Sequence, residues 1–522
     1  MNRDRVIDQI VDRSDPWDII VIGGGATGLG TAVEAASRGY ATLLLEQHDF
    51  GKGTSSRSTK LIHGGVRYLQ QGNLSLVVEA LHERELLLRN APHLVHHQAF
   101  IVPTYEWWEG PFYGVGLKLY DVLAGKLGFG SSKILSRDET LAEIPTLEPD
   151  GLRGGVIYYD GQFDDARLAI TLAHTIIDLG QYAANYFSVT SLTKHNGLIQ
   201  GVIATDGETG REYELHARAV INATGPFVDS VRQMDDEHAP DIIAPSQGIH
   251  IVLDKSFEPG ESAIMVPHTD DGRILFAVPW HNRVIVGTTD TPIEQSTPEP
   301  EPLPEEIDFL LSHAAKYLTK NPEPRDILSV FAGIRPLIKA ESDRHTATIS
   351  RDHHLNISPS GLITIAGGKW TTYRKMGEDT VDQAITVGSL EKRPSQTQDL
   401  RLHGWSDISE PDQTFAIYGT DATALAALGL RKRKWTEKIH PDLPYTAVEV
   451  IWAVRHEMAR TLEDVLARRT RALILDARAS MAAAPKVASL MAKELGKGRS
   501  WRKQQVDAYV NLAKRYLPPE ER

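Results

Sequence analysis

Cysteine is absent from this 522-residue sequence. Disulfide bonds, thiolate catalysis, iron–sulfur clusters and cysteine-ligated zinc are therefore excluded, and any redox activity must rest on a bound cofactor. Long apolar runs are also absent, since no stretch approaches the ~20 apolar residues that a bilayer-spanning helix needs. Residues 1–15 are charged and lack an apolar core, so they do not have the form of a secretory signal. We therefore expect a cytoplasmic protein that can still lie peripherally on the inner face of the cell membrane.

Positive charge is scarce in the sequence. The 56 lysine and arginine residues are outnumbered by 69 acidic residues, which gives a formal net charge of −13. General nucleic-acid binders carry a basic field, so this balance argues against a nucleic-acid partner. The hydrophobic content of 41% and the charged content of 24% are typical of globular proteins. At this length we expect about two or three domains.

A dinucleotide-binding pattern lies near the start of the chain. Residues 19–22 form a short β-branched run typical of a buried strand. Gly23, Gly25 and Gly28 follow as G-x-G-x-x-G, which allows a tight turn, close approach of a pyrophosphate and close helix packing. Glu46 ends the next apolar run, where a carboxylate can bind both hydroxyls of an adenosine ribose. The pattern predicts a β–α–β nucleotide-binding unit but does not separate NAD from FAD.

Residues 51–69 are dense in hydroxyl side chains and glycine. Such a stretch offers many donors to a ligand that carries phosphates and a polar ring edge, whereas the plain alternative is a solvated loop. Apolar residues within it favour burial. Arg67 and Tyr68, directly after Gly64 and Gly65, are placed to point into a site.

Three later segments carry further candidate chemistry. His250 lies at the start of a predicted strand, where a buried structural histidine is the competing interpretation. Arg335 precedes a proline, which restricts it to an extended conformation and so fixes where its side chain points. Gly367, Gly368 and Lys369 connect a strand to a helix start, so their backbone amides repeat the anion-binding arrangement of the first motif.

Several segments have both a plain and a functional interpretation. His93, His96 and His97 are interpreted as surface histidines of a loop, because a metal site needs several convergent ligands, and no metal is expected. The aromatic stretch 105–130 is either core packing or a surface that faces lipid or quinone. The basic islands 431–434 and 493–503 are either solvated or in contact with anionic lipid.

Taken together, five motifs resemble the FAD-dependent glycerol-3-phosphate dehydrogenases: the fingerprint at 18–46, STKLIHGGVRYL at 58–69, DDARL at 164–168, FAGIRPL at 331–337 and the helical stretch 455–470. The resemblance runs from about residue 17 to at least residue 476. The small-residue strand end at 220–225 also resembles the ATG motif of two-dinucleotide-domain flavoproteins, which favours FAD over NAD.

The resemblance implies an α/β fold with a Rossmann-like FAD-binding domain of the glutathione-reductase and D-amino-acid-oxidase type. A mixed α/β substrate domain is inserted into it, and a helical domain follows. The expected boundaries are 17–73, 150–230 and 340–390 for the FAD-binding domain, 74–149 and 231–339 for the substrate domain, and 400–522 for the helical domain.

The implied activity is oxidation of sn-glycerol 3-phosphate to dihydroxyacetone phosphate, with hydride transfer to FAD and electrons passed to a membrane quinone. The expected catalytic residues are His250, Arg335 and Lys369, and the expected substrate-binding residues are Arg67, Tyr68 and Arg351. His250 is the expected general base or proton relay, since histidine titrates near working pH. Which cation holds the phosphate is left open. The expected FAD-binding residues are Gly23, Gly25, Gly28, Glu46, Thr54, Ser55, Ser58, Lys60, His63, Gly64, Gly65, Thr224, Gly225, Gly367, Gly368 and Thr371.

Other functions stay open on the sequence. A related oxidase would pass its electrons to oxygen and make peroxide. An FAD-dependent oxidoreductase for another 2-hydroxy or 2-amino acid would use the same arginines on a carboxylate. A flavin-binding scaffold would bind the cofactor without turnover. A homodimer and an anionic lipid surface are left open as partners.

Overall fold

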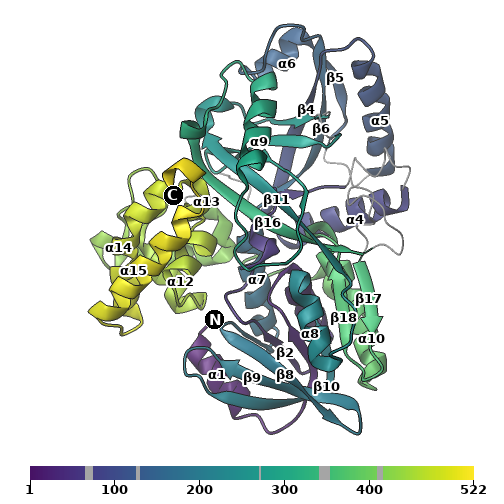
Figure 1. Ribbon diagram of the computed structural model, residues 1–522, viewed down its shortest axis with the longest axis vertical. Helices are drawn as coiled ribbons and strands as arrows, with labels where there is room; N and C mark the ends of the chain where they lie inside the picture. Colours follow the sequence, from purple (N-terminus) through teal and green to yellow (C-terminus); the bar gives the residue numbers. More distant parts are fainter. Residues whose placement is uncertain (65–73, 125–129, 268, 270–271, 340–352, 408–414) are drawn as a thin grey trace.

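The computed structural model describes residues 1–64, 74–124, 130–267, 269, 272–339, 353–407 and 415–522. Two sheets lie one above the other in Figure 1, and a group of C-terminal helices lies to their left. Helix α1 (Arg3–Val11) precedes the first strand and packs beside the lower sheet.

The first sheet carries the fingerprint. Its strand order is β17-β18-β10-β1-β2-β7, and the neighbouring strands from β18 to β7 are parallel. An antiparallel hairpin, β8 and β9, extends β10. The central strand is apolar and buried from Ile19 to Ile22, and helices α2 (Ala26–Ser37) and α10 (Tyr373–Val387) belong to the same core. The strands are β1 (Trp17–Ile22), β2 (Thr42–Leu45), β7 (Tyr182–Ala184), β8 (Phe187–His195), β9 (Leu198–Asp206), β10 (Glu212–Asn222), β17 (His353–Ile357) and β18 (Ile363–Gly367).

The second sheet is mostly antiparallel and follows the order β15-β11-β14-β13-β12-β4-β6-β3, with β16 on β11 and β5 on β6. Helices α4 (Leu74–Asn90), α5 (Glu109–Ala124), α6 (Arg137–Glu143) and α9 (Pro304–Tyr317) accompany it. The strands are β3 (Leu61–Ile62), β4 (Val95–Thr104), β5 (Lys133–Ser136), β6 (Gly154–Phe163), β11 (Ile243–Asp254), β12 (Ala263–Val266), β13 (Leu275–Trp280), β14 (Arg283–Gly287), β15 (Thr291–Pro292) and β16 (Ile327–Ile338).

Two strands pair differently from the predicted segmentation. β3 and β6 come from segments assigned to the FAD-binding domain, but both hydrogen-bond within the second sheet. The reason is long-range pairing: β6 is matched over its full length by β4, a partner some fifty residues earlier that local sequence cannot indicate. Helix α7 (Asp165–Asp178) then returns the chain to the first sheet. Asp164 caps this helix, since its side chain accepts a hydrogen bond from the Arg167 amide.

The C-terminal part is helical, as expected. It comprises α11 (Ala422–Leu430), α12 (Ala447–His456), a π-helical turn at Asp464–Arg469, α13 (Ala472–Leu475), α14 (Ala477–Glu494) and α15 (Arg499–Lys514). Its core joins the second sheet through Phe331 and Trp280. Among the described helices, none has the length and apolarity to cross a bilayer. The remaining helix, α8 (Val228–Asp235), follows β10.

The histidine cluster is not the surface loop that was predicted. His93 is buried, and His96 and His97 lie on strand β4. The two strand residues are exposed, and His96 bonds to Gln162 of β6. The apolar run at 99–102 that follows them belongs to the same strand.

Candidate active site

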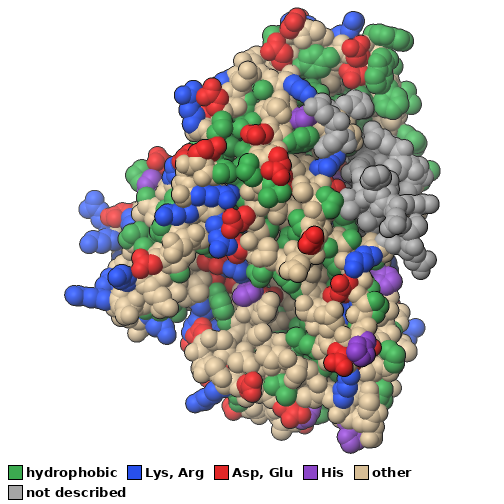
Figure 2. Space-filling view, viewed as in Figure 1, with side chains coloured by type: hydrophobic (Ala, Val, Ile, Leu, Met, Phe, Trp, Pro, Cys, Tyr) green, Lys and Arg blue, Asp and Glu red, His purple; other side chains and the backbone are tan. Residues whose placement is uncertain are grey.

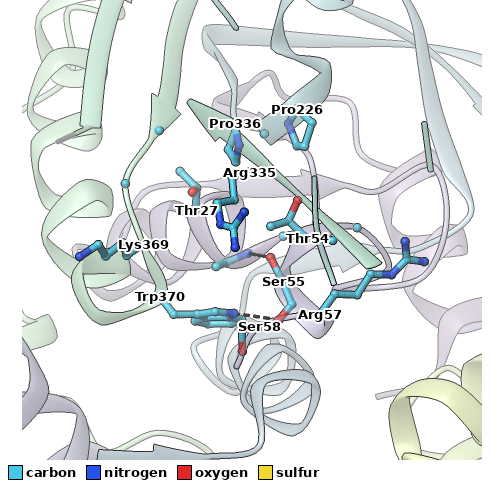
Figure 3. A pocket seen from close by; sticks show the side chains of 18 of the residues that line it. Thr27, Thr54, Ser55, Arg57, Ser58, Pro226, Arg335, Pro336, Lys369 and Trp370 are labelled. Carbon is cyan, nitrogen blue, oxygen red and sulfur yellow. Dashed lines mark hydrogen bonds between the residues drawn. The ribbon is translucent and has the colours of Figure 1, made fainter. Parts of the chain in front are cut away.

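A cavity of about 680 Å³ lies between the two sheets and collects most of the predicted site residues. It is lined from the first sheet by the glycine turn and from the second sheet by β11 and β16 (Figure 3). Its size is that of a small-molecule or cofactor site. The predicted residues on its wall are Gly23, Gly25, Glu46, Thr54, Ser55, Ser58, His63, Thr224, Gly225, His250, Arg335, Gly367, Gly368, Lys369 and Thr371.

The glycine turn has the close approaches that the fingerprint demands. Gly23 has a φ of +111°, and a side chain there would come within 2.7 Å of the Ala223 carbonyl oxygen. A side chain at Gly28 would overlap the carbonyl oxygen of Gly23, so Gly28 packs beneath the turn and not on the cavity wall. Gly25 caps α2 and has no side chain to cover the amides of the first turn. The Ala26 amide donates to the Ser55 hydroxyl at 2.8 Å, and the other amides of the turn and the helix dipole can meet phosphate.

Glu46 is oriented by backbone amides. Its carboxylate accepts hydrogen bonds from the Gly24 amide at 2.6 Å and from the His48 amide at 2.7 Å. Burial raises the pKa of Glu46, and the two amide bonds oppose that rise. The side chain lines the cavity at the end of β2, so it is fixed where the ribose was predicted.

Lys60 does not bind in the cavity as predicted. Its ammonium is fully buried and donates to Asp165 Oδ2 at 2.7 Å and to the Ser56 carbonyl at 2.9 Å. Burial lowers the pKa of Lys60 to about 8. The same carboxylate accepts from the amide and the hydroxyl of Ser58. Asp165 thus holds the loop from behind, and the lysine neutralises that carboxylate instead of facing a ligand.

Gly64 is also placed differently from its prediction. Its amide donates to Asp160, and a side chain there would collide with Tyr120 and Leu81. It provides close packing against α4 and α5. Gly65, Arg67, Tyr68 and Arg351 lie outside the described residues.

Arg335 is the most firmly held cation on the cavity wall. Its guanidinium donates to Asp290 at 3.1 Å, to the Thr288 hydroxyl at 3.0 Å and to the Thr289 carbonyl at 2.9 Å. It also donates to the Gln247 carbonyl across the β11–β16 pair. Strand β16 extends through Pro336, as the arginine–proline order predicts. The side chain projects into the cavity beside Thr27 and Thr54 (Figure 3).

His250 is buried on the opposite strand of the same pair. Its ring stacks on Phe331 at a centroid distance of 4.8 Å, and its Nε2 lies 2.9 Å from the Thr59 hydroxyl. Gly287 leaves room for the ring, since a side chain there would collide with it. Burial, with the charges of Lys60 and Arg335, lowers the pKa of His250 well below its ordinary value. The imidazole is therefore neutral at physiological pH.

The third predicted segment closes the cavity from β18. Gly367 and Gly368 have φ values of +77° and +73°, which make the turn before α10. Trp370 donates from its indole to the Ser55 carbonyl at 2.8 Å and so ties this turn to the cavity loop (Figure 3). Lys369 lines the cavity, but its ammonium points away from Arg335 in Figure 3.

Sequence reasoning missed a chain of ion pairs at the cavity edge. Lys52 and Arg57 line the cavity, and both pair with Glu299, at 3.1 Å and 2.7 Å. Lys52 also bonds to Glu463 of the C-terminal helices. Glu299 comes from a stretch rich in proline and glutamate that reads as a surface connection. The positive charges at 52 and 57 were visible in the sequence, but their acidic partners are distant in the chain.

The donor set fits a flavin dinucleotide. The N-terminus of α2, the Glu46 carboxylate and a second glycine turn face one continuous cavity. Residues 18–374 match the family model described as FAD dependent oxidoreductase, and residues 380–505 match the C-terminal domain of alpha-glycerophosphate oxidase. The chain therefore belongs to the FAD-dependent oxidoreductase family, and FAD is its cofactor.

Within that family its relatives are named glycerol-3-phosphate dehydrogenases. The mitochondrial enzyme of Macaca fascicularis is 42% identical over 542 residues, covering 97% of this chain and 74% of the relative. The human mitochondrial enzyme is 41% identical with the same coverage. Among solved structures, glycerol-3-phosphate dehydrogenase from Bacillus halodurans complexed with FAD is 29% identical, with a TM-score of 0.81 over 99% of this chain and 98% of that one. The predicted family, fold class and cofactor are confirmed.

Proposed function

We propose that this chain oxidises sn-glycerol 3-phosphate to dihydroxyacetone phosphate and passes the electrons to a membrane quinone. The observation that carries the proposal is the meeting of Arg335 and His250 with the glycine turn in one cavity. When bound, FAD accepts the hydride that leaves C2 of the alcohol. The chain itself has to hold the phosphate, orient C2 and take the hydroxyl proton.

Arg335 supplies a fixed positive charge. Because Asp290 and the two threonines hold its guanidinium in place, it can stabilise negative charge on the substrate without reorganising. An arginine is suited to both phosphate and alkoxide oxygens. His250, which is neutral and buried, is the proposed proton acceptor. Lys369, Arg67, Tyr68 and Arg351 are proposed as further contacts to the substrate.

A substrate panel tests the proposed reaction. The purified yellow protein is mixed anaerobically with glycerol 3-phosphate, glycerol, lactate, glycine or proline, and absorbance near the flavin maximum is followed. We expect bleaching by glycerol 3-phosphate alone. Bleaching by a 2-hydroxy or 2-amino acid would favour the alternative substrate class. A bound flavin that no compound bleaches would favour a scaffold without turnover.

Helix α5 supports the quinone as electron acceptor. One of its faces is buried through Tyr113, Leu117 and Tyr120. The opposite face is apolar but exposed, at helical spacing, and it forms a patch at the upper right of Figure 2. We define the outer face of α5 as Phe112, Val115, Leu119 and Val122, with exposed fractions of 56%, 73%, 45% and 74%. Trp108, which is 41% exposed, directly precedes the helix.

Helix α5 of the aromatic stretch 105–130 therefore has one face that packs on the core and one face that is exposed. We propose that the exposed face lies on lipid. Exposed apolar patches of this kind mark contacts, and tryptophan suits the membrane–water interface. Trp107, 74% exposed, extends the patch beyond the helix. A peripheral contact through this face would bring the enzyme to the layer in which quinones dissolve.

Flotation with liposomes tests this contact. The V115D/V122D variant should lose liposome binding and the quinone-reductase rate measured with vesicle-borne quinone. Its flavin should still be bleached by glycerol 3-phosphate, because the outer face lies outside the cavity. L198D, on strand β9, is the matched control, since Leu198 is 57% exposed. Oxygen consumption with equimolar peroxide in the absence of membranes would contradict the quinone assignment.

The basic islands are not needed for this contact. Residues 431–434 and 493–503 lie on the C-terminal helices, whose lysine and arginine side chains project from the left edge of Figure 2. The outer face of α5 lies at the opposite edge of the same view. We therefore assign the membrane contact to α5. A contribution of anionic lipid at the islands would appear as binding that persists in V115D/V122D and falls with salt.

A further inference from the structure

The surroundings of His250 contain a feature that the proposed function does not use. His250 lines the cavity, but its two ring nitrogens are in different surroundings. Nδ1 is buried and has no hydrogen-bond partner among the described residues, and Nε2 is already bonded to the hydroxyl of Thr59 at 2.9 Å. The residue as a whole is 3% exposed.

Thr59 lies beside the histidine on the cavity wall. It is half-buried and lines the cavity wall, one residue before the buried Lys60. A hydroxyl can accept one hydrogen bond while it donates another. When the hydroxyl donates to Nε2, its oxygen keeps an acceptor lone pair for a group inside the cavity. The sequence did not single out Thr59, because residues 51–69 contain several hydroxyl side chains and give no reason to prefer one of them.

Building on the proposed function, we propose that Thr59 is a proton relay between the substrate hydroxyl and Nε2 of His250. The substrate O–H bond breaks, and its proton binds to Thr59 Oγ1 as the proton of the Thr59 hydroxyl moves to Nε2. In the same reaction the hydrogen on C2 leaves with its electron pair as hydride to FAD. The alcohol is oxidised to the ketone, and the histidine becomes an imidazolium. No threonine alkoxide forms, since the two proton transfers are concerted.

The relay makes two physical demands. Nε2 must be the unprotonated nitrogen, so the imidazole has to be neutral with its proton on Nδ1. The cations facing the ring are Lys60 and Arg335, which are paired with Asp165 and Asp290, and they keep the imidazole neutral. The base can also be weak. Once hydride begins to leave C2, the substrate oxygen becomes that of a protonated carbonyl, which is far more acidic than an imidazolium.

The ring is held rigidly for this task. Stacking on Phe331 and the close contact with Gly287 hold the plane of the ring. The hydrogen bond to Thr59 holds Nε2 toward the threonine hydroxyl. Thr59 acts through geometry and proton transfer and needs no charge of its own. A valine at this position keeps the shape of threonine but removes the hydroxyl, whereas a serine keeps the hydroxyl.

Anaerobic stopped-flow reduction of the holoenzyme by glycerol 3-phosphate tests the relay. T59V should reduce its flavin about 100-fold more slowly or worse, with little change in the substrate dissociation constant, and T59S should stay within about 5-fold of wild type. The double variant T59V/H250F should be no slower than the slower single variant, because both changes cut one path. T190V, on an exposed strand position, is the matched control and should be unchanged.

A second measurement needs no variant. The rate of wild-type reduction is followed as the deuterium content of the solvent rises, and a curved dependence is expected because two protons move together. A linear dependence would overturn the relay, as would a T59V rate equal to wild type or losses in T59V and H250F that multiply. If glycerol 3-phosphate does not reduce the flavin of the wild-type enzyme, the proposed function and the relay are both wrong. Normal wild-type reduction with a fast T59V overturns the relay alone.

Discussion

The two ends of the cavity are built in different ways. The dinucleotide end comes from one continuous β–α–β segment, residues 17–46, and relies on backbone amides and missing side chains. The substrate end is assembled from β11, β16, β18 and the loop before β3, which are far apart in the chain. There the chemistry depends on side chains that hold each other, such as Arg335 with Asp290. Changes at the first end should therefore affect cofactor binding, and changes at the second should affect the reaction rate.

The largest effect is expected from Gly28 at the dinucleotide end. In G28A the added methyl group would overlap the Gly23 carbonyl oxygen, so the turn has to open and the helix has to move away. We expect protein without bound flavin and without activity, measured as the ratio of flavin to protein absorbance. G498A is the control, because a methyl group there meets nothing within 4 Å. A yellow, active G28A protein would contradict the proposed packing.

The next effect belongs to Arg335 at the substrate end. R335K keeps the charge but loses the planar fork that bonds Asp290 and the two threonines. We expect normal flavin content and a 10²- to 10³-fold slower anaerobic reduction by glycerol 3-phosphate, about 3–4 kcal/mol of transition-state stabilisation. Loss of flavin from R335K would mean that a change at the substrate end also weakens cofactor binding.

A smaller effect is expected from Glu46. E46Q loses the charge that accepts the Gly24 and His48 amides and that we predict to bind the ribose. FAD affinity should fall about 10- to 100-fold, since bonds to charged groups contribute about 1.5–3 kcal/mol. Fluorescence titration of the apoprotein measures it. The reduction rate at saturating FAD should match wild type; a slow saturated enzyme would place Glu46 in the reaction instead.

The smallest effect is expected outside both ends, at His403. Burial opposes protonation there, but hydrogen bonds to Asp178 and Asp421 raise the pKa of His403 to about 9. A raised folded-state pKa adds stability that is complete below the unfolded value of 6.5 and disappears as pH rises through about 9. H403Q should thus be less stable than wild type at pH 6, by about 1 kcal/mol or less.

Urea unfolding from pH 6 to pH 10 measures this difference. The difference in the free energy of unfolding between H403Q and wild type should disappear above pH 9. The flavin content and the reduction rate of H403Q should equal those of wild type at every pH. A gap that persists at pH 10 would mean that the histidine stabilises the fold by packing, for example on His174, and not by its charge.

The same contrast explains what the sequence could predict. The glycine turn, Glu46 and the arginine–proline pair are local patterns whose geometry follows from neighbours in the chain, and all of them line the cavity or support it. Lys60 was assigned to the cofactor because its acidic partner, Asp165, is 105 residues away. Thr59 and Glu299 gave no signal for the same reason. The direction of a polar side chain depends on partners that are distant in the chain. A local sequence pattern cannot identify these partners.

Helix α5 adds a second lesson of this kind. Its apolar residues occupy both faces, so composition alone could not separate core from surface, and the structure assigns one face to each. The domain boundaries show the same limit, because β3 and β6 follow their distant partners into the second sheet.

The most direct measurement is an anaerobic titration of the purified yellow protein with sn-glycerol 3-phosphate, with product assayed at each point. We predict stepwise loss of the flavin absorbance and one dihydroxyacetone phosphate formed for each flavin reduced. A spectrum that stays oxidised at saturating glycerol 3-phosphate, or bleaching without that product, would contradict the proposed reaction.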